Sequence, residues 1–283
     1  MAATPQVATT VAFTEGPTCD NAGNVFFTET KFNRIMKLTP KGDLTVFREN
    51  SNAANGLVFD LEERLIACEG NNANPRVTRT DIRTGRLEVL ADRSMGLTLN
   101  APNDVTFDNQ GRLYFTDLPG GTVHRIDRNG KVTRILSAPD IQRPNGITIS
   151  PDDKTLYLVE ANQAAGGARM LRVYDLRADG TVTNMRGFHT FYPGRSADGI
   201  TIDSVGNVYA AAGLNATRGT SETLATKPGV HVFSPKGAQL EYYPIPEDTV
   251  TNICFGGPDW KTVYVTAGKT LFTFRVEIAG TRR

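Results

Sequence analysis

The sequence has no long hydrophobic run and almost no net charge. Its 283 residues include 31 Lys and Arg against 30 Asp and Glu, which leaves a formal net charge of +1. Such a balance gives little electrostatic basis for binding nucleic acid or an anionic membrane surface. No apolar stretch approaches the roughly 18 residues that span a bilayer. We therefore expect a small-molecule ligand, with no nucleic-acid and no membrane partner.

Cysteine and histidine are also scarce. The three cysteines, Cys19, Cys68 and Cys254, are far apart and lie in apolar stretches, which indicates buried thiols in a reduced compartment rather than a disulfide framework. The three histidines stand singly, without the spacing of a zinc site or a histidine-based triad. Residues 1–5 lack the basic stretch and apolar core of a signal peptide. We expect a cytoplasmic protein, or a periplasmic or secreted one if a leader has been removed.

One phrase recurs six times along the chain. In each copy a polar residue opens a short β-rich run, a turn containing Gly or Asp follows, and a second β-rich run completes the unit. The opening residues are Glu15, Asn55, Asn103, Asn145, Asp198 and Asn252. They lie on average about 47 residues apart, the period of a four-stranded propeller blade, and no segment shows sustained helical periodicity. The sequence predicts an all-β protein: a six-bladed β-propeller with four antiparallel strands per blade, forming one domain over residues 1–283.

The two ends of the chain predict how this ring closes. After the last copy only residues 270–276 read as a further strand, so the sixth blade lacks its outermost strand. Residues 7–13 are rich in β-branched side chains and belong to no other blade. Pairing the two segments would satisfy both exposed edges. We predict that an N-terminal strand closes the last blade.

The blade geometry also predicts a site. The first strand of a propeller blade lines the central channel and the second returns antiparallel to it, so the residues that open strand one and close strand two share one face of the ring. Four of the closing residues are acidic: Glu29, Glu69, Asp117 and Glu160. Such oxygen donors suit Ca²⁺, with Mg²⁺, Mn²⁺ or Zn²⁺ as substitutes.

Turn formation is the alternative explanation for these residues. Asn-Gly and Asp-Gly are common turn dipeptides, and three of the openings have that form. Glu15 is followed by Gly-Pro and Asn103 by Asp, however, so the convergence of acids and amides at all six openings favours a metal site. Among the closing residues, strand-end capping is favoured for Glu29 and Glu160, and is as well supported as a role in the site for Glu69 and Asp117.

Longer motifs surround several of the openings: Phe13-Thr14-Glu15-Gly16-Pro17, Leu99-Asn100-Ala101-Pro102-Asn103-Asp104-Val105, Arg143-Pro144-Asn145-Gly146-Ile147 and Ala197-Asp198-Gly199-Ile200. Together they resemble the gluconolactonase family, which includes the senescence marker protein (regucalcin) and the luciferin-regenerating enzymes. The resemblance covers nearly the whole chain. It implies a six-bladed propeller with a divalent cation, usually Ca²⁺, in the channel mouth. It also implies that Glu15, Asn145 and Asp198 bind the metal, that Asn103 touches metal or substrate, and that Asp198 is the catalytic acid/base.

We therefore expect a divalent-metal-dependent hydrolase that opens sugar-type lactones. The cation would polarise the ring carbonyl, and Asp198 would accept the proton of the attacking water. The residues expected to hydrogen-bond the substrate hydroxyls are Asn100, Asn103, Asn252 and Glu69, with loops 93–100 and 213–229 as lids. A solvated surface loop is the alternative for both segments and is as well supported for 93–100.

Two other functions are compatible with the same residues. The first is a metal-dependent esterase or phosphotriesterase that uses the same site. The second is a non-catalytic, Ca²⁺-binding propeller. A redox propeller would need basic and histidine ligands, which the openings lack. We expect a monomer or a weak oligomer.

Overall fold

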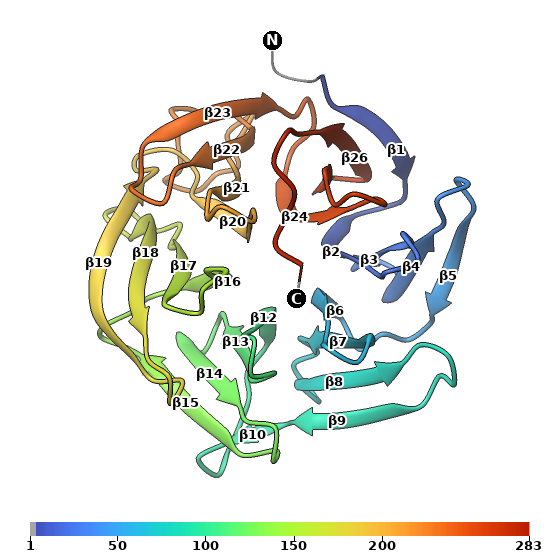
Figure 1. Ribbon diagram of the computed structural model, residues 1–283. Coiled ribbons are helices and arrows are strands. Elements are labelled where there is room, and N and C mark those ends of the chain that lie inside the picture. Colours follow the sequence, from blue (N-terminus) through green and yellow to red (C-terminus); the bar gives the residue numbers. More distant parts are fainter. Residues whose placement is uncertain (1–3, 283) are drawn as a thin grey trace.

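The computed structural model describes residues 4–282 as a ring of six four-stranded antiparallel sheets (Figure 1). This confirms the all-β, six-bladed propeller that the repeat predicts. Residues 1–3 and residue 283 lie outside the described residues, and residues 1–3 belong to the segment on which the expectation about a signal peptide rests. The described part of the chain contains no helix long and apolar enough to cross a membrane.

Within a blade the strands follow one another along the chain, and the first strand is the innermost. The first three blades comprise β2 (Thr14–Cys19), β3 (Val25–Glu29), β4 (Arg34–Leu38) and β5 (Leu44–Arg48); β6 (Ala54–Phe59), β7 (Arg64–Glu69), β8 (Arg76–Asp81) and β9 (Leu87–Ala91); and β12 (Pro102–Phe107), β13 (Leu113–Asp117), β14 (Thr122–Ile126) and β15 (Val132–Ser137). Blades 4 and 5 comprise β16 (Pro144–Ile149), β17 (Thr155–Ala161), β18 (Arg169–Leu176) and β19 (Val182–Thr190); and β20 (Ala197–Ile202), β21 (Val208–Ala212), β22 (Gly229–Phe233) and β23 (Gln239–Pro244). A short hairpin of β10 (Arg93–Ser94) and β11 (Leu97–Thr98) links blades 2 and 3.

The sixth blade is closed by the N-terminal strand, as predicted. It contains β24 (Val250–Gly256), β25 (Thr262–Ala267) and β26 (Thr270–Arg275), and β1 (Gln6–Thr10) pairs antiparallel with β26 as its outermost strand. The first and last parts of the chain thus share one sheet. This pairing gives β26 a partner on its outer side, which would otherwise be an open edge.

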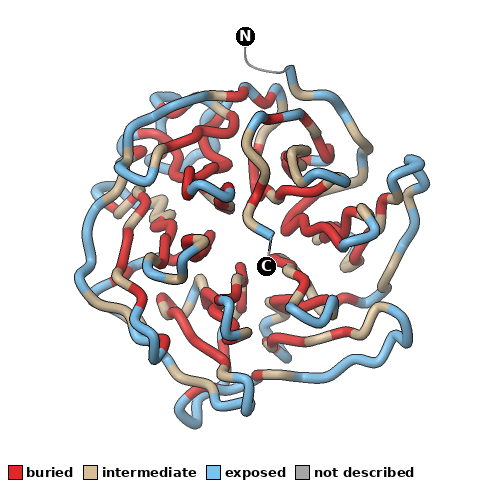
Figure 2. Tube along the Cα trace, viewed as in Figure 1, coloured by how far each residue is buried: buried red, intermediate tan, exposed pale blue. Residues whose placement is uncertain are grey.

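The hydrophobic core lies between neighbouring blades. Inner strands such as β3 and β21 are wholly buried, whereas outer strands such as β19 are largely exposed (Figure 2). Tyr209 of blade 5 and Phe255 of blade 6 meet edge to face across one of these interfaces, with ring centroids 5.0 Å apart. An aromatic pair of this kind adds about 0.5–1.5 kcal/mol to the burial of its surface.

One mouth of the channel is crossed by the C-terminal tail, which reaches the centre of the ring in Figure 1. The backbone N–H of Thr281 donates to the carbonyl oxygen of Ile202 at 3.1 Å, and the guanidinium of Arg282 donates to Asn21 Oδ1 at 2.8 Å. These contacts tie the tail to blades 5 and 1 at the end where first strands turn into second strands. The residues that open the first strands lie at the opposite mouth.

Candidate functional site

Each first strand carries an irregularity next to its opening residue. Strand pairing shifts register between the following residues: Glu15 and Thr18, Ala54 and Leu57, Pro102 and Val105, Pro144 and Ile147, Ala197 and Ile200, Val250 and Asn252. Such β-bulges leave a residue unpaired and redirect its side chain. The Asn-Gly and Asp-Gly pairs therefore lie within strands and not in turns.

The residue after the opening is usually glycine because the inner strands approach one another closely. A Cβ atom on Gly146 would collide with the backbone oxygen of Asp198, and one on Gly199 would collide with the side chain of Asn252. In blade 3 the equivalent residue is Asp104, which puts a carboxyl group into the channel. Burial raises the pKa of Asp104 to about 7.

Four residues that are distant in the sequence line one cavity of about 260 Å³: Glu15, Asn103, Asn145 and Asp198. They come from blades 1, 3, 4 and 5. The volume lies just below the range of about 300–1,000 Å³ that is usual for ligand pockets, and so suits a compact molecule. The cavity is also lined by charged residues that the repeated phrase does not contain: Arg143, Arg195, Arg218 and Glu222.

Asp198 is held by two neighbours. Asn145 Nδ2 donates to Asp198 Oδ1 at 2.5 Å, and the guanidinium of Arg195 donates to Asp198 Oδ2. Arg195 is itself fixed by a 2.9 Å hydrogen bond to the carbonyl oxygen of Val250. Burial raises the pKa of Asp198 above 3.8, while the charge of Arg195 and the hydrogen bond from Asn145 oppose that rise.

Glu15 faces the same cavity but lacks a cationic partner within residues 4–282. Its side chain is buried, and its one hydrogen bond is accepted by Oε2 from the backbone N–H of Gly16 at 3.2 Å. Burial, reinforced by the negative charge of Asp198, raises the pKa of Glu15 well above 4.5. The cavity thus holds two acidic groups that repel each other, a situation that a bound cation would relieve.

These donors fit a hard divalent cation. Carboxylate oxygens of Glu15 and Asp198, with amide oxygens of Asn145 and Asn103, are the ligand types that Ca²⁺ takes. Because Asn145 donates through Nδ2, its Oδ1 remains free to bind a cation. Residues 4–282 contain no cluster of three or more His, Cys, Asp or Glu that would form a metal site, so a cation here depends on the amide oxygens for about half of its protein ligands.

Asn252 does not line this cavity. The residue that opens the first strand of blade 6 is Thr251, one position before the residue predicted. The register places Thr251 at the position of Asn145 and Asp198, and Asn252 at the position of Asp104. Thr251 accordingly lines the cavity with Asp198, whereas Asn252 lies in the channel beside Asp104 and hydrogen-bonds its carboxyl group. A shift of one residue along a strand moves a side chain to the other face.

Glu69 and Asn100 also lie outside the lining of the cavity. Glu69 is fully buried and accepts hydrogen bonds from Arg48 at 2.5 Å, Arg76 at 2.6 Å and Thr78 at 2.7 Å. Asn100 is exposed, and its backbone N–H donates to Asp117 at 2.7 Å. The other closing acids have similar contacts: Glu29 pairs with Arg34, and Glu160 accepts from the backbone N–H groups of Gln142 and Arg143. All four closing acids hold neighbouring segments of chain.

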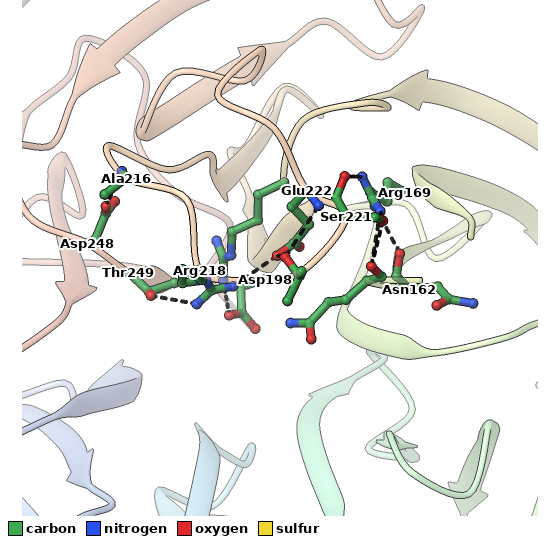
Figure 3. A network of polar contacts seen from close by, with 12 residues as sticks. Asn162, Arg169, Asp198, Ala216, Arg218, Ser221, Glu222, Asp248 and Thr249 are labelled. Atoms are coloured by element: carbon green, nitrogen blue, oxygen red, sulfur yellow. Dashed lines mark hydrogen bonds and ion pairs between the residues drawn. The ribbon is translucent and has the colours of Figure 1, made fainter. Parts of the chain in front are cut away.

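Loop 213–229 contributes Arg218 and Glu222 to the cavity. Arg218 donates to Thr249 Oγ1 at 2.8 Å and to Glu222 Oε2 at 3.2 Å (Figure 3). Its charge opposes the rise in the pKa of Asp198 that burial causes. Asp248 accepts hydrogen bonds from the backbone N–H groups of Asn215 and Ala216, which fastens the start of the loop.

Arg169 fastens the middle of the same loop (Figure 3). It is almost fully buried, and its guanidinium donates to five carbonyl oxygens: those of Asn162, Gln163, Ala164, Pro193 and Ser221, at 2.8–3.2 Å. This cluster joins blade 4 to loop 213–229. Neither Arg169 nor Arg218 belongs to the repeat, so sequence periodicity gave no signal for them.

The fold and the site together define a class: a six-bladed propeller with an acid- and amide-lined cavity at one mouth of its channel. Residues 13–269 match the model of the SMP-30/Gluconolactonase/LRE-like region. The chain belongs to this family.

Individual relatives agree with this assignment. A gluconolactonase of Zymomonas mobilis is 26% identical over 312 aligned residues, which cover 97% of this chain and 81% of the relative. Two solved structures share the fold. A gluconolactonase of Xanthomonas campestris has a TM-score of 0.82 at 24% identity, covering 97% of this chain and 90% of that one. A calcium-binding regucalcin of Agrobacterium tumefaciens has a TM-score of 0.77 at 22% identity, covering 99% and 95%.

Proposed function

We propose that this protein is a divalent-metal-dependent hydrolase that opens sugar-type lactones. The observation that carries the proposal is the meeting of Glu15, Asn103, Asn145 and Asp198 in one cavity, from four different blades. Family membership supports the reaction class, since the relative from Zymomonas mobilis is named a gluconolactonase.

Glu15 and Asp198 would hold the cation with their carboxylates, and Asn145 and Asn103 with their amide oxygens. Bound there, Ca²⁺ or a similar ion supplies Lewis-acid polarisation of the lactone carbonyl. Two carboxylates balance the charge of a divalent ion. Four protein ligands are fewer than the six to eight that Ca²⁺ takes, which leaves places for substrate and water.

Asp198 is the residue we assign as general base. Its carboxylate would take a proton from the attacking water and return it to the alkoxide that leaves when the ring ester opens. Burial raises its pKa from 3.8, which makes it a stronger base, while Arg195 and Asn145 keep it ionised and fix its direction. Arg195 therefore acts as a positioning residue.

The test is proton release from glucono-1,5-lactone at constant pH with Ca²⁺ present. Asp198→Asn should lower kcat by at least about 100-fold, the usual contribution of a positioned base. Asp179→Asn, in an exposed turn, is the matched control and should behave as the wild type. Aryl esters and organophosphates should be poor substrates. Retention of lactone turnover by Asp198→Asn would remove Asp198 from this role, and a preference for organophosphates would replace the lactonase assignment.

A further inference from the structure

The cavity contains two polar side chains that the proposed reaction does not use. The guanidinium of Arg143 is half-buried at the cavity wall, and within residues 4–282 it makes no hydrogen bond or ion pair. The side-chain amide of Gln163, also half-buried and lining the cavity, has no hydrogen-bond partner among these residues either. Two donors without a protein partner in the described part of the chain thus face one cavity, and a ligand that fills the cavity and excludes water from it would have to pair with both.

Both residues come from blade 4. Arg143 immediately precedes β16, and its position is fixed because its backbone N–H donates to Glu160 at 2.8 Å. Gln163 follows β17, and its carbonyl oxygen is held by Arg169 and Ser221. The backbones are thus anchored while the polar ends remain free, which is the arrangement expected of a preformed binding subsite.

The charges of the cavity favour an anion. Its lining contains three carboxylates, of Glu15, Asp198 and Glu222, and three guanidiniums. Arg195 is paired with Asp198, and Arg218 with Glu222, which leaves Arg143 as the unpaired cation of the lining. A divalent cation on Glu15 and Asp198 would give the cavity a positive excess of two charges. A cavity with excess positive charge attracts negatively charged ligands.

The remaining walls give the subsite a direction. Phe13 and Leu118, which belong to the blade 1 and blade 3 sides of the cavity, are apolar. A negatively charged group would therefore be placed toward blade 4, beside Arg143 and Gln163. A guanidinium binds carboxylate or phosphate through two parallel hydrogen bonds, and an amide adds a third donor.

We propose that Arg143 and Gln163 bind an anionic substituent, a carboxylate or a phosphate, on a sugar lactone whose carbonyl lies at the acid and amide cluster. The inference rests on the proposed lactonase function and narrows its substrate class. Arg143 is then the residue that sets specificity between charged and neutral lactones.

The experiment compares lactones that differ only in this substituent. Glucaro-1,4-lactone carries a carboxylate where glucono-1,4-lactone carries a hydroxymethyl group, and 6-phosphoglucono-1,5-lactone pairs in the same way with glucono-1,5-lactone. The readout is the ratio of kcat/KM for the charged lactone to that for its neutral partner. A charge-assisted hydrogen bond predicts a ratio of about 10 to 100 in the wild type. The pair with the larger ratio identifies carboxylate or phosphate as the group recognised.

Substitutions then assign the ratio to the subsite. Arg143→Met should reduce it at least tenfold, Arg143→Lys should retain part of it, and Gln163→Met should lower it by a smaller factor. Arg83→Met removes an exposed guanidinium on an outer turn and should leave the ratio unchanged. The ratio should also decrease with added salt, because ionic strength screens the attraction. A wild-type ratio near one for both pairs, or a ratio unaffected by Arg143→Met, would overturn the inference.

A binding experiment tests the anion subsite separately from the proposed hydrolase function. If no lactone is hydrolysed with any of the four ions, calorimetric titration of the Ca²⁺-loaded protein with glucarate tests the subsite alone. Binding that Arg143→Met weakens at least tenfold supports the anion subsite although the hydrolase assignment is lost. Absence of binding rejects the subsite as well.

Discussion

Replacement of Glu15 by glutamine should change stability in opposite directions in the metal-free and the Ca²⁺-loaded protein. Without metal, the fold buries the Glu15 carboxyl beside Asp198 with no cationic partner of its own, and the pKa of Glu15 is raised well above 4.5. A group whose folded pKa is raised in this way costs stability as the pH rises above its unfolded value. Glu15→Gln keeps the shape of the side chain and removes its charge, and with it this cost, which is about 1.4 kcal/mol for each unit by which folding raises a pKa.

The gain should appear at pH 8 and be small at pH 4, where the Glu15 carboxyl is protonated in the folded state and mostly protonated in the unfolded state. Thermal unfolding of chelated protein measures it, with a rise of about 2 °C or more expected for a chain of this size. Ca²⁺ should reverse the order of the two proteins. At a hundred times its Kd it stabilises the wild type by about 2.7 kcal/mol, and Glu15→Gln should lose nearly all of this gain.

Asp104→Asn is the control for charge alone. It removes a buried carboxyl from the neighbouring part of the channel while leaving the four proposed ligands intact. It should also stabilise the metal-free protein at pH 8, yet it should keep most of the stabilisation by Ca²⁺. If Glu15→Gln destabilises the metal-free protein at pH 8, or responds to Ca²⁺ as the wild type does, the cation site described above is wrong.

Two further predictions concern parts of the fold around the site. Arg169→Ala should lower the free energy of unfolding in urea by about 3 kcal/mol, because it removes several hydrogen bonds that a buried guanidinium donates to backbone carbonyl oxygens. It should also lower lactone turnover by loosening loop 213–229, and unchanged stability would contradict the anchoring role of Arg169. Burial lowers the pKa of His124 from 6.5 to about 4. The contribution of the neutral His124 to the free energy of unfolding is therefore fully present above pH 6.5 and is lost as the pH falls toward 4, by at most about 3 kcal/mol. His124→Gln should flatten the decrease in the free energy of unfolding, measured in urea, between pH 6.5 and 4. An unaltered decrease would show that His124 is not the group responsible.

The ring was predictable because each blade repeats the same local pattern. A polar residue opens each copy, two short β-rich runs follow it, and the copies recur on average about every 47 residues along the chain. Closure by β1 followed from an unpaired strand at each end. The bulges were not predictable in the same way, since Asn-Gly reads as a turn unless the neighbouring blade that approaches the glycine is known.

The candidate site was predictable where the opening residue itself faces the cavity, as Glu15, Asn145 and Asp198 do. Thr251 was predictable in the same way as these residues. In blades 2 to 5 the opening residue lies two positions before the first apolar residue that follows it, and in blade 6 the residue two positions before Ile253 is Thr251. Arg195, Arg218 and Glu222 could not be found from the repeat. They occupy linkers and loop 213–229, and only the packing of the blades brings them beside Asp198.

The most direct test of the proposed metal-dependent lactonase function is to add metal ions back to the chelated protein. Proton release from glucono-1,5-lactone would be followed at constant pH before and after addition of one equivalent of Ca²⁺, Mg²⁺, Mn²⁺ or Zn²⁺. We predict that chelation abolishes hydrolysis and that at least one of these ions, Ca²⁺ first, restores it. Undiminished hydrolysis in excess chelator, or no hydrolysis with any of the four ions, would contradict the proposed metal-dependent lactonase function.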